Sequence, residues 1–375
     1  MKVVIAIDSF KGSLTSLEAG RAIKSGILKA VDAEVIVKPL ADGGEGTTDA
    51  LIEGLSGEKV PLTVTGPLGA PVEAYYGLIP QSNTAIMEMA MASGITLVHR
   101  GELDPMRCTT YGVGEMIRDA IQKGIRNFII GIGGSATNDG GTGMLQALGY
   151  SFTDADGQPV GLGGQCLAKI AHISDENVIP ELKECTFSIA SDVENPLCGP
   201  KGATYIYGPQ KKVTEELLPI LDAGMNNYGK VSEEFFGVST METPGAGAAG
   251  GLGFAFVTYL NGELKSGIDL VMDAVGLEES MRYADYVITG EGRLDQQTAM
   301  GKGPVGVARL GKKYGAKTIA FAGALTEGAH ACNDAGIDGY FCILSSVVTL
   351  DEAMDAKIAA GNLELTAEQL FRLLG

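Results

Sequence analysis

The stretch "MKVVIAIDSFKGSLTSLEAGRAIKSGILKA", residues 1–30, has the pattern of a buried β-strand, a loop and an amphipathic helix. The apolar run at residues 2–7 is short enough for a buried strand of a parallel sheet. Thr15 and Glu18 form the Thr-x-x-Glu capping box that marks the start of the helix. The loop at residues 8–14 therefore follows the carboxyl end of a strand, where open α/β sheets bind ligands.

The same order of strand, loop and helix recurs near both ends of the chain. "EVIVKPLADGGEG" predicts a second strand at residues 34–38, a loop that holds Asp42, and a helix over 47–55. Beyond residue 284 the pattern predicts strands at 285–290, 317–323 and 340–346, a helix at 304–315, and a final helix opened by a Thr349/Glu352 capping box. Strands that alternate with helices indicate a parallel sheet covered on both faces.

The Gly- and Pro-rich stretch "TVTGPLGAPV" interrupts this alternation near Thr63. After it, the pattern predicts a helix over 111–124, a strand over 127–130 and a strand that ends at Asp192. We therefore predict the α/β class with two domains. These are a Rossmann-like, doubly wound parallel-sheet domain built from both chain ends, residues 1–63 and 285–375, and a second α/β domain inserted over residues 64–284.

The composition of the 375 residues describes an acidic globular protein. Hydrophobic residues make up 45% and charged residues 20%, which excludes disordered and fibrous classes. The formal net charge of -18 repels nucleic acid and anionic membranes, so we expect neither as a partner. Six scattered cysteines form no CxxC pair, and the first residues do not form a secretory signal. We therefore expect a cytoplasmic protein without disulfides.

The string "GIGGSATNDGGTGML", residues 131–145, holds six glycines directly after an apolar run. Glycine lets a ligand approach backbone N–H groups, and a glycine-rich turn before a helix favours anions. A mobile surface loop is the alternative, which the preceding strand pattern disfavours. We predict that this loop binds phosphate or substrate oxygens through Gly133, Gly134, Ser135, Thr137, Asn138, Asp139, Gly140 and Gly141.

Carboxylates follow other predicted strands, namely Asp8, Asp42, Asp192 and Glu291. A solvated turn explains any one of them, but their recurrence at strand ends points to chemistry. Phosphoryl transfer needs a proton acceptor, cations on the phosphates, and Mg²⁺, which takes one or two carboxylates. Lys11 and Lys302 lie in glycine-containing loops suited to meet phosphate oxygens, although a surface lysine is an alternative for either of them.

Other enzyme classes have less support in the sequence. No Walker A pattern occurs, which disfavours a P-loop NTPase. Gly131, Gly133 and Ala136 satisfy the dinucleotide pattern G-x-G-x-x-A, with Asp154 roughly twenty residues further on, so an NAD(P)-dependent oxidoreductase stays an alternative. The histidines lie in separate segments and no G-x-S-x-G elbow occurs, so a hydrolase or a histidine metal site has little support.

A set of strings spread over nearly the whole chain resembles the bacterial glycerate kinase family with two α/β domains. The strings are "VIAIDSFKGSLTS", "PLADGGEGT", "TTYGVGE", "GIGGSATNDGGTGML", "SDVENPL", "GAAGGLG" and "TGEGRLDQQTAMGKGP". The resemblance implies ATP-dependent phosphorylation of D-glycerate with Mg²⁺, giving ADP and phosphoglycerate, usually 2-phosphoglycerate. It also implies a Rossmann-like domain from both chain ends, an inserted domain, and a site in the cleft between the two.

Within this chemistry the candidate residues take separate roles. Asp192, Asp8 and Lys11 are the candidate catalytic residues, with Asp192 as the base or a metal ligand. The expected metal ligands are Asp42, Glu45 and Glu291, and Lys302 joins the glycine loop in binding ATP. The expected substrate-binding residues are Ser9, Arg107, Arg293 and Asn195; either arginine can supply a bidentate fork for the carboxylate of glycerate.

Further alternatives stay open at this point. The chain could phosphorylate another small hydroxy acid, or it could be a catalytically silent binding module, since two α/β lobes around a cleft also describe solute-binding proteins. The small-molecule partners that we expect are ATP and D-glycerate. The sequence does not determine which hydroxyl of glycerate receives the phosphate, nor the oligomeric state, for which a homodimer is one option.

Overall fold

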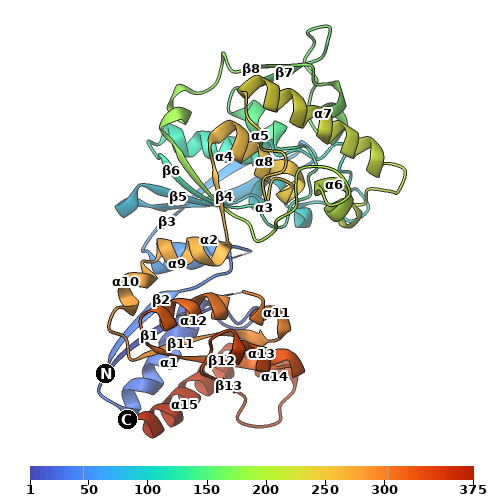
Figure 1. The fold of residues 1–375 in the computed structure, drawn as a ribbon. Coiled ribbons are helices and arrows are strands. Elements are labelled where there is room, and N and C mark those ends of the chain that lie inside the picture. Colours follow the sequence, from blue (N-terminus) through green and yellow to red (C-terminus); the bar gives the residue numbers. More distant parts are fainter. Residues whose placement is uncertain (45, 302) are drawn as a thin grey trace. The chain divides into compact units, whose positions relative to one another are not determined.

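The computed structural model describes residues 1–44, 46–301 and 303–375, and its chain divides into two compact units (Figure 1). The first unit contains residues 1–42, 49–56 and 268–375, and the second contains residues 43–48 and 57–267. The first unit is therefore assembled from both chain ends. In the part of the chain that is described, no helix has the length and apolar character needed to cross a membrane.

Three segments, residues 43–48, 57–63 and 268–284, belong to the other unit than the one expected from sequence. Residues 57–63 lie in the second unit, because β3 (Glu58–Thr65) pairs with β4 (Pro71–Ile79) as an antiparallel hairpin. Residues 268–284 lie in the first unit, where the Lys38 ammonium donates a hydrogen bond to the Val275 carbonyl at 2.7 Å. These differences arise from tertiary contacts, which a break in local pattern does not reveal.

The first unit is built on a parallel five-stranded sheet in the order β13-β12-β11-β1-β2. Its strands are β1 (Lys2–Ile7), β2 (Glu34–Pro39), β11 (Tyr286–Leu294), β12 (Lys317–Leu325) and β13 (Gly339–Cys342). Its helices are α1 (Ser16–Ala30), α10 (Leu277–Met281), α11 (Gln296–Ala299), α12 (Gly303–Lys313), α13 (Ala331–Asp334), α14 (Leu350–Met354) and α15 (Ala356–Leu374), while α2 (Thr47–Gly54) and α9 (Gly267–Ala274) begin where the chain enters the unit.

Helices cover both faces of this sheet. Ile319 and Phe321 of β12 belong to a hydrophobic core that includes residues of α1 and α15, such as Ile23. The alternate residue Ala320 belongs to a separate core with Val305 of α12. Because successive strand residues point to opposite faces, the two cores lie on opposite sides of the sheet. The predicted doubly wound α/β arrangement is confirmed for this unit.

The end of the chain forms two helices where the sequence predicted one. The Thr349/Glu352 capping box is present and begins α14, which ends at Met354. Asp355 then adopts an extended conformation, and its side chain accepts hydrogen bonds from the N–H groups of Lys357 and Ile358 at 3.0 Å. Asp355 therefore caps α15 as a new helix, because an aspartate at this position competes with helix continuation.

The second unit contains a mixed six-stranded sheet in the order β10-β9-β6-β5-β4-β3. Four of these strands run parallel, and the β3–β4 hairpin adds an antiparallel edge because its connection of residues 66–70 is too short for a crossover. The other strands of this sheet are β5 (Thr84–Glu88), β6 (Asn127–Gly131), β9 (Thr186–Ala190) and β10 (Glu263–Lys265). In the same unit, β7 (Ser151–Thr153) and β8 (His172–Ser174) pair as a separate two-stranded antiparallel sheet. Its helices are α3 (Ala90–Ser93), α4 (Tyr111–Gln122), α5 (Thr142–Ala147), α6 (Ala203–Tyr207), α7 (Leu218–Phe236) and α8 (Ala248–Leu260).

Two glycines of the α1–α15 pair give a matched test of this packing. A methyl group at Gly26 of α1 would lie 2.1 Å from the Glu364 carbonyl oxygen of α15, whereas one at exposed Gly361 of α15 meets nothing within 4 Å. We expect Gly26→Ala to destabilise the protein by about 1–3 kcal/mol through overpacking. We expect Gly361→Ala to stabilise it by about 0.5–1 kcal/mol through helix propensity. Urea unfolding followed by circular dichroism measures both, and equal stability of the two variants would contradict this packing.

Candidate functional site

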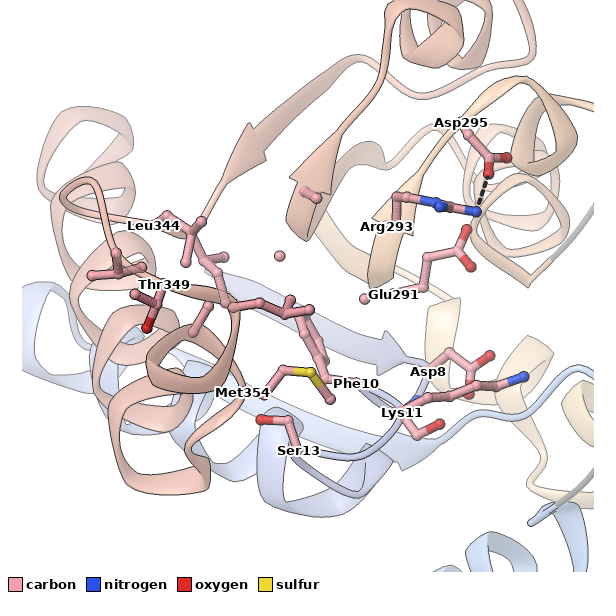
Figure 2. Close-up of a pocket in the computed structure, with 18 of the residues that line it drawn as sticks. Asp8, Phe10, Lys11, Ser13, Glu291, Arg293, Asp295, Leu344, Thr349 and Met354 are labelled. Carbon is pink, nitrogen blue, oxygen red and sulfur yellow. Dashed lines mark hydrogen bonds and ion pairs between the residues drawn. The ribbon is translucent and has the colours of Figure 1, made fainter.

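The carboxyl ends of the parallel strands in the first unit border a pocket of about 640 Å³ (Figure 2). β1 and β11 are neighbouring strands, and the chain continues from β1 to β2 on one side and from β11 to β12 and β13 on the other. Open α/β sheets bind ligands at such a reversal of strand order. The pocket brings together six of the residues predicted from sequence, namely Asp8, Ser9, Lys11, Asp42, Glu291 and Arg293.

The backbone of β11 determines where the two central carboxylates lie. The Asp8 N–H donates a hydrogen bond to the Gly290 carbonyl at 2.9 Å, which joins the end of β1 to β11. Gly290 has φ +147°, and a Cβ there would lie 1.9 Å from the Phe321 carbonyl oxygen, so no larger residue fits. The next residue, Glu291, accepts a hydrogen bond from the Thr298 hydroxyl at 2.6 Å. Asp8 and Glu291 are thus held on adjacent strands.

Asp8 is a carboxylate of this pocket whose acidity is strongly perturbed. It is buried, with 8% of its surface exposed, and burial is the main cause that raises its pKa from 3.8 to about 7. Asp42 and Glu291 raise this pKa further, while the Ser9 N–H, at 2.6 Å from Oδ1, and the Lys11 ammonium lower it. A carboxyl group with a pKa near neutrality can accept a proton from a substrate.

The acidic side chains of the pocket fit a divalent cation. Asp42 and Glu291 each raise the pKa of Asp8, so both carboxylates lie close enough to repel its negative charge. Among the described residues, no group of three or more His, Cys, Asp or Glu side chains is arranged to hold a metal by itself. Mg²⁺ requires less, because it takes one or two carboxylates together with waters and substrate phosphates. Glu45 and Lys302, expected from sequence to bind metal and phosphate, lie outside the described residues.

Arg293 carries a positive charge on the same side of the pocket, beside Glu291 (Figure 2). Its guanidinium lies 3.2 Å from the carboxylate of Asp295, and most of the arginine side chain is exposed. Asp295 also accepts a hydrogen bond from the Gln297 N–H at 2.8 Å and caps α11. Asp295 was not among the residues predicted from sequence, although the spacing Asp-x-x-Thr is the signal of its capping box.

In the second unit, the loops after β5, β6, β9 and β10 are joined by hydrogen bonds at the carboxyl edge of the sheet. The Met89 N–H donates to the Gly131 carbonyl at 2.8 Å, and the Gly267 N–H donates to Asp192 Oδ1 at 3.0 Å. Asp192 is exposed at this edge. The predicted glycine loop and Asp192 therefore follow neighbouring strands, β6 and β9, of one sheet.

Most side chains of the glycine loop point inward. The side chains of Thr137, Asn138 and Asp139 are fully buried, and Asp139 accepts hydrogen bonds from the Thr110 N–H and hydroxyl at 2.8 and 2.9 Å. The Gly141 and Gly143 N–H groups also donate to Asp139. Asn138 donates to the Thr204 hydroxyl at 3.1 Å. These predicted phosphate-binding side chains instead hold the loop in shape, and phosphate contact by them stays a prediction.

The exposed part of the loop is Gly133 and Gly134. By contrast, Gly140 and Gly141 serve close packing, because a Cβ would lie 2.6 Å from the Tyr228 ring and 2.4 Å from the Ala255 methyl group, respectively. The loop thus offers backbone N–H groups over a short stretch.

The glycine loop also does not run directly into a helix, since α5 begins only at Thr142. The dinucleotide pattern ending at Ala136 therefore lacks the helix that it requires.

A buried lysine that the sequence analysis missed lies beneath this loop. Lys211 is 1% exposed, and its ammonium donates to the Ser135 hydroxyl at 2.7 Å and to the Thr137 carbonyl at 2.6 Å. Burial lowers its pKa from 10.5 to about 8, although Asp139 and Cys108 act in the opposite direction. The string "GPQKKV" carries no local pattern that distinguishes Lys211 from a surface lysine.

Glu88 is a second residue that the sequence analysis missed. It ends β5, is 4% exposed, and accepts hydrogen bonds from the Thr48 N–H at 2.8 Å and the Gly46 N–H at 3.4 Å. It therefore anchors the backbone of the segment 43–48 within the second unit. In the sequence, the signal for Glu88 is a carboxylate at the end of a mostly apolar stretch.

The remaining predicted substrate-binding residues lie on the second unit. Asn195 donates to the Lys201 carbonyl at 2.7 Å and accepts from the Tyr207 hydroxyl at 2.6 Å, so both ends of its amide stabilise the loop after β9. Arg107 is exposed, and its N–H donates to the Asp104 carbonyl at 3.0 Å. The roles assigned to Asn195 and Arg107 stay predictions.

Known proteins resemble this chain along its whole length. The model of the glycerate kinase family matches residues 3–375. The glycerate kinase of Bacillus subtilis (strain 168) is 44% identical over 99% of this chain and 97% of its own length. The glycerate 2-kinase of Escherichia coli (strain K12) is 46% identical over 94% of this chain and 93% of its own length.

The fold agrees with a solved structure as well. A crystal structure from Salmonella typhimurium LT2, of a protein described as a glycerate kinase 2, superposes with a TM-score of 0.92. It is 43% identical in sequence, and the match covers 100% of this chain and 98% of that one. These comparisons confirm the resemblance seen in the sequence strings. The chain belongs to the glycerate kinase family.

Proposed function

We propose that this protein transfers the γ-phosphoryl group of ATP to D-glycerate and releases ADP and 2-phosphoglycerate. The observation that carries the proposal is the family match over residues 3–375. The 2-hydroxyl is preferred because one relative of 46% identity is named a glycerate 2-kinase. The pocket of the first unit supports phosphoryl transfer, since it combines a carboxylate of near-neutral pKa with Lys11 and Arg293.

The chain offers two candidate acceptors for the proton of the attacking hydroxyl. Asp8 has a pKa of about 7 and lines the pocket beside Lys11, whose ammonium is suited to neutralise a phosphate oxygen. Asp192 is exposed after β9 and accepts a hydrogen bond from the Gly267 N–H. The pKa of Asp8 favours it as the base. Asp192 stays our candidate for a base or a metal ligand on the second unit.

The other pocket residues fit the binding of metal and substrate. Asp42 and Glu291 would hold Mg²⁺, and the ion would neutralise phosphate charge. The third sequence-based candidate, Glu45, lies outside the described residues. Arg293 would hold the glycerate carboxylate, and Ser9 lines the same pocket. On the second unit, the backbone of Gly133 and Gly134 would bind an anionic group of a substrate.

A coupled assay tests the proposed activity and its regiochemistry together. Enolase consumes 2-phosphoglycerate directly, whereas 3-phosphoglycerate requires phosphoglycerate mutase first. With ATP, Mg²⁺ and D-glycerate, we expect signal with enolase alone and no further increase when mutase is added. A signal that depends on mutase would contradict the 2-position, and no ADP release with D-glycerate would contradict the kinase activity.

Replacement of Asp8 tests its assignment as the base. We expect Asp8→Asn to lower kcat by about 10²-fold or more, the range for loss of a positioned base. Because the folded-state pKa of Asp8 is raised from 3.8 to about 7, wild type loses stability relative to Asp8→Asn as pH rises from about 4 to about 7. The difference should be constant above pH 8. Thermal unfolding without ligands measures it.

The exposed Asp334 of the same unit supplies the control, because Asp334→Asn removes one negative charge outside the pocket. A stability difference for Asp8→Asn that does not change between pH 4 and pH 7 would contradict the raised pKa. Wild-type turnover in Asp8→Asn would remove Asp8 from the reaction.

Replacement of Lys211 tests whether the glycine loop serves the reaction, with Lys211 as a positioning residue. Lys211→Met keeps a long side chain but removes the ammonium that holds Ser135 and the Thr137 carbonyl. We expect kcat/KM to fall about tenfold or more, since loop geometry controls catalysis. In wild type, kcat/KM should decline as pH rises through about 8, where the ammonium of Lys211 loses its proton.

This decline at about pH 8 should be absent in Lys211→Met. The neighbouring Lys212 is exposed, so Lys212→Met is the matched control and should keep both the wild-type rate and its pH profile. Circular dichroism verifies that each variant is folded. A folded Lys211→Met protein with the wild-type pH profile would show that Lys211 does not position the loop for catalysis.

A further inference from the structure

The pocket of the first unit has two chemically different halves (Figure 2). Asp8, Lys11, Glu291 and Arg293 form one side, where they carry charge. The other half is lined by the apolar side chains of Phe10, Ile343, Leu344, Val348, Leu350 and Met354. The residue roles proposed above for this pocket all lie in the charged half. The three-carbon hydroxy acid has no apolar part that would need the other half.

A tight turn forms one wall of the apolar half. The Ser13 N–H donates to the Phe10 carbonyl at 2.7 Å, and Gly12 between them has φ +78°. A Cβ at Gly12 would lie 2.7 Å from Cε of Met354, so the end of α14 packs directly on this turn. Phe10 and Met354 thus form one continuous apolar surface from two segments distant in sequence.

Two glycines without side chains lie next to this wall. Gly292 of β11 and Gly323 of β12 both line the pocket, and a Cβ at Gly323 would lie 2.8 Å from the Gly292 carbonyl oxygen and 3.7 Å from the Phe10 ring. A side chain at Gly323 would therefore crowd the Gly292 carbonyl, so this wall of the pocket consists of bare backbone. Bare backbone suits a flat group that approaches the strands closely.

One polar atom in the apolar half lacks a partner. The Ser13 hydroxyl oxygen is shielded from solvent and has no hydrogen-bond partner among the described residues, although Ser13 lines the pocket. A shielded hydroxyl without a partner costs free energy. A ligand with hydrogen-bonding nitrogens at this position would satisfy it.

We propose that the apolar half of this pocket binds the adenine base of ATP, with the charged half beside the phosphates. This inference rests on the proposed kinase function. A purine is flat and largely apolar, and it carries ring nitrogens that can pair with the Ser13 hydroxyl. Glycerate is polar throughout and would leave the surface of Phe10 and Met354 unused. A pocket of about 640 Å³ is also in the size range of small-molecule sites.

Truncation of two side chains tests the proposal in the intact protein. We expect Leu344→Ala and Met354→Ala to raise the KM for ATP about tenfold or more, and to change the KM for glycerate less than about twofold. Ile358→Ala is the matched control, because Ile358 is an exposed residue of α15 that does not line the pocket. A rise in the KM for glycerate instead of that for ATP would overturn the assignment.

Adenosine is a probe that separates this proposal from the kinase activity. We expect adenosine to compete with ATP, and calorimetry should show that it binds wild type and Ile358→Ala but binds Leu344→Ala and Met354→Ala at least about tenfold more weakly. Equal binding to all four proteins, or no binding to wild type, overturns the adenine site. If wild type binds adenosine yet fails to phosphorylate glycerate, the base site stands and the proposed function fails.

Discussion

The parallel pairing of β1 with β11 is the constraint on which the candidate site depends. Residues 3–5 lie opposite residues 286–288, so segments from opposite ends of the sequence become neighbours in one sheet. The Asp8 N–H then bonds the Gly290 carbonyl, and Gly290 cannot carry a side chain because β12 approaches too closely. The carboxylates of Asp8 and Glu291 meet as a consequence. The loops after these two strands lie where the strand order reverses. The backbone topology alone therefore places a ligand pocket there, whatever the side chains are.

Two buried ionisable groups add electrostatic strain to this framework, one in each unit. Asp8 has a raised pKa and Lys211 a lowered one, and burial is the main cause in both cases. Each shift means that the charged form is less favourable in the folded protein than in the unfolded chain. Apolar residues of similar size generally serve stability as well or better at buried positions. Asp8 lines the pocket, where a ligand can contact it, and Lys211 holds the glycine loop, so both groups are better explained by the candidate site than by folding.

Local pattern predicted much of the first unit, because its elements are encoded over short stretches. The strand at Lys2–Ile7 and the capping box of Thr15 and Glu18 lie where the sequence placed them, and so do the carboxylates that follow the strands. Lys211 and Glu88 escaped prediction for a common reason. Their roles arise from hydrogen bonds to backbone about 40 to 75 residues away, and burial of a charged side chain leaves no periodic signal. The apolar wall of the pocket was missed likewise, since Phe10 and Met354 meet only in the folded unit.

Glycines in the glycine-rich strings of this chain have two different roles, exposure of the backbone and close packing. Composition alone cannot tell which role a given glycine has. In the loop after β6, Gly133 and Gly134 are exposed, whereas Gly140 and Gly141 are buried against the Tyr228 ring and the Ala255 methyl group. The buried pair leaves no room for a side chain, whereas a Cβ at Gly133 would meet nothing within 4 Å, and only the exposed pair leaves backbone N–H groups within reach of an anion. The distinction depends on what packs behind the loop. A glycine-rich loop therefore becomes an argument for anion binding only once the residues that hold its far side have been identified.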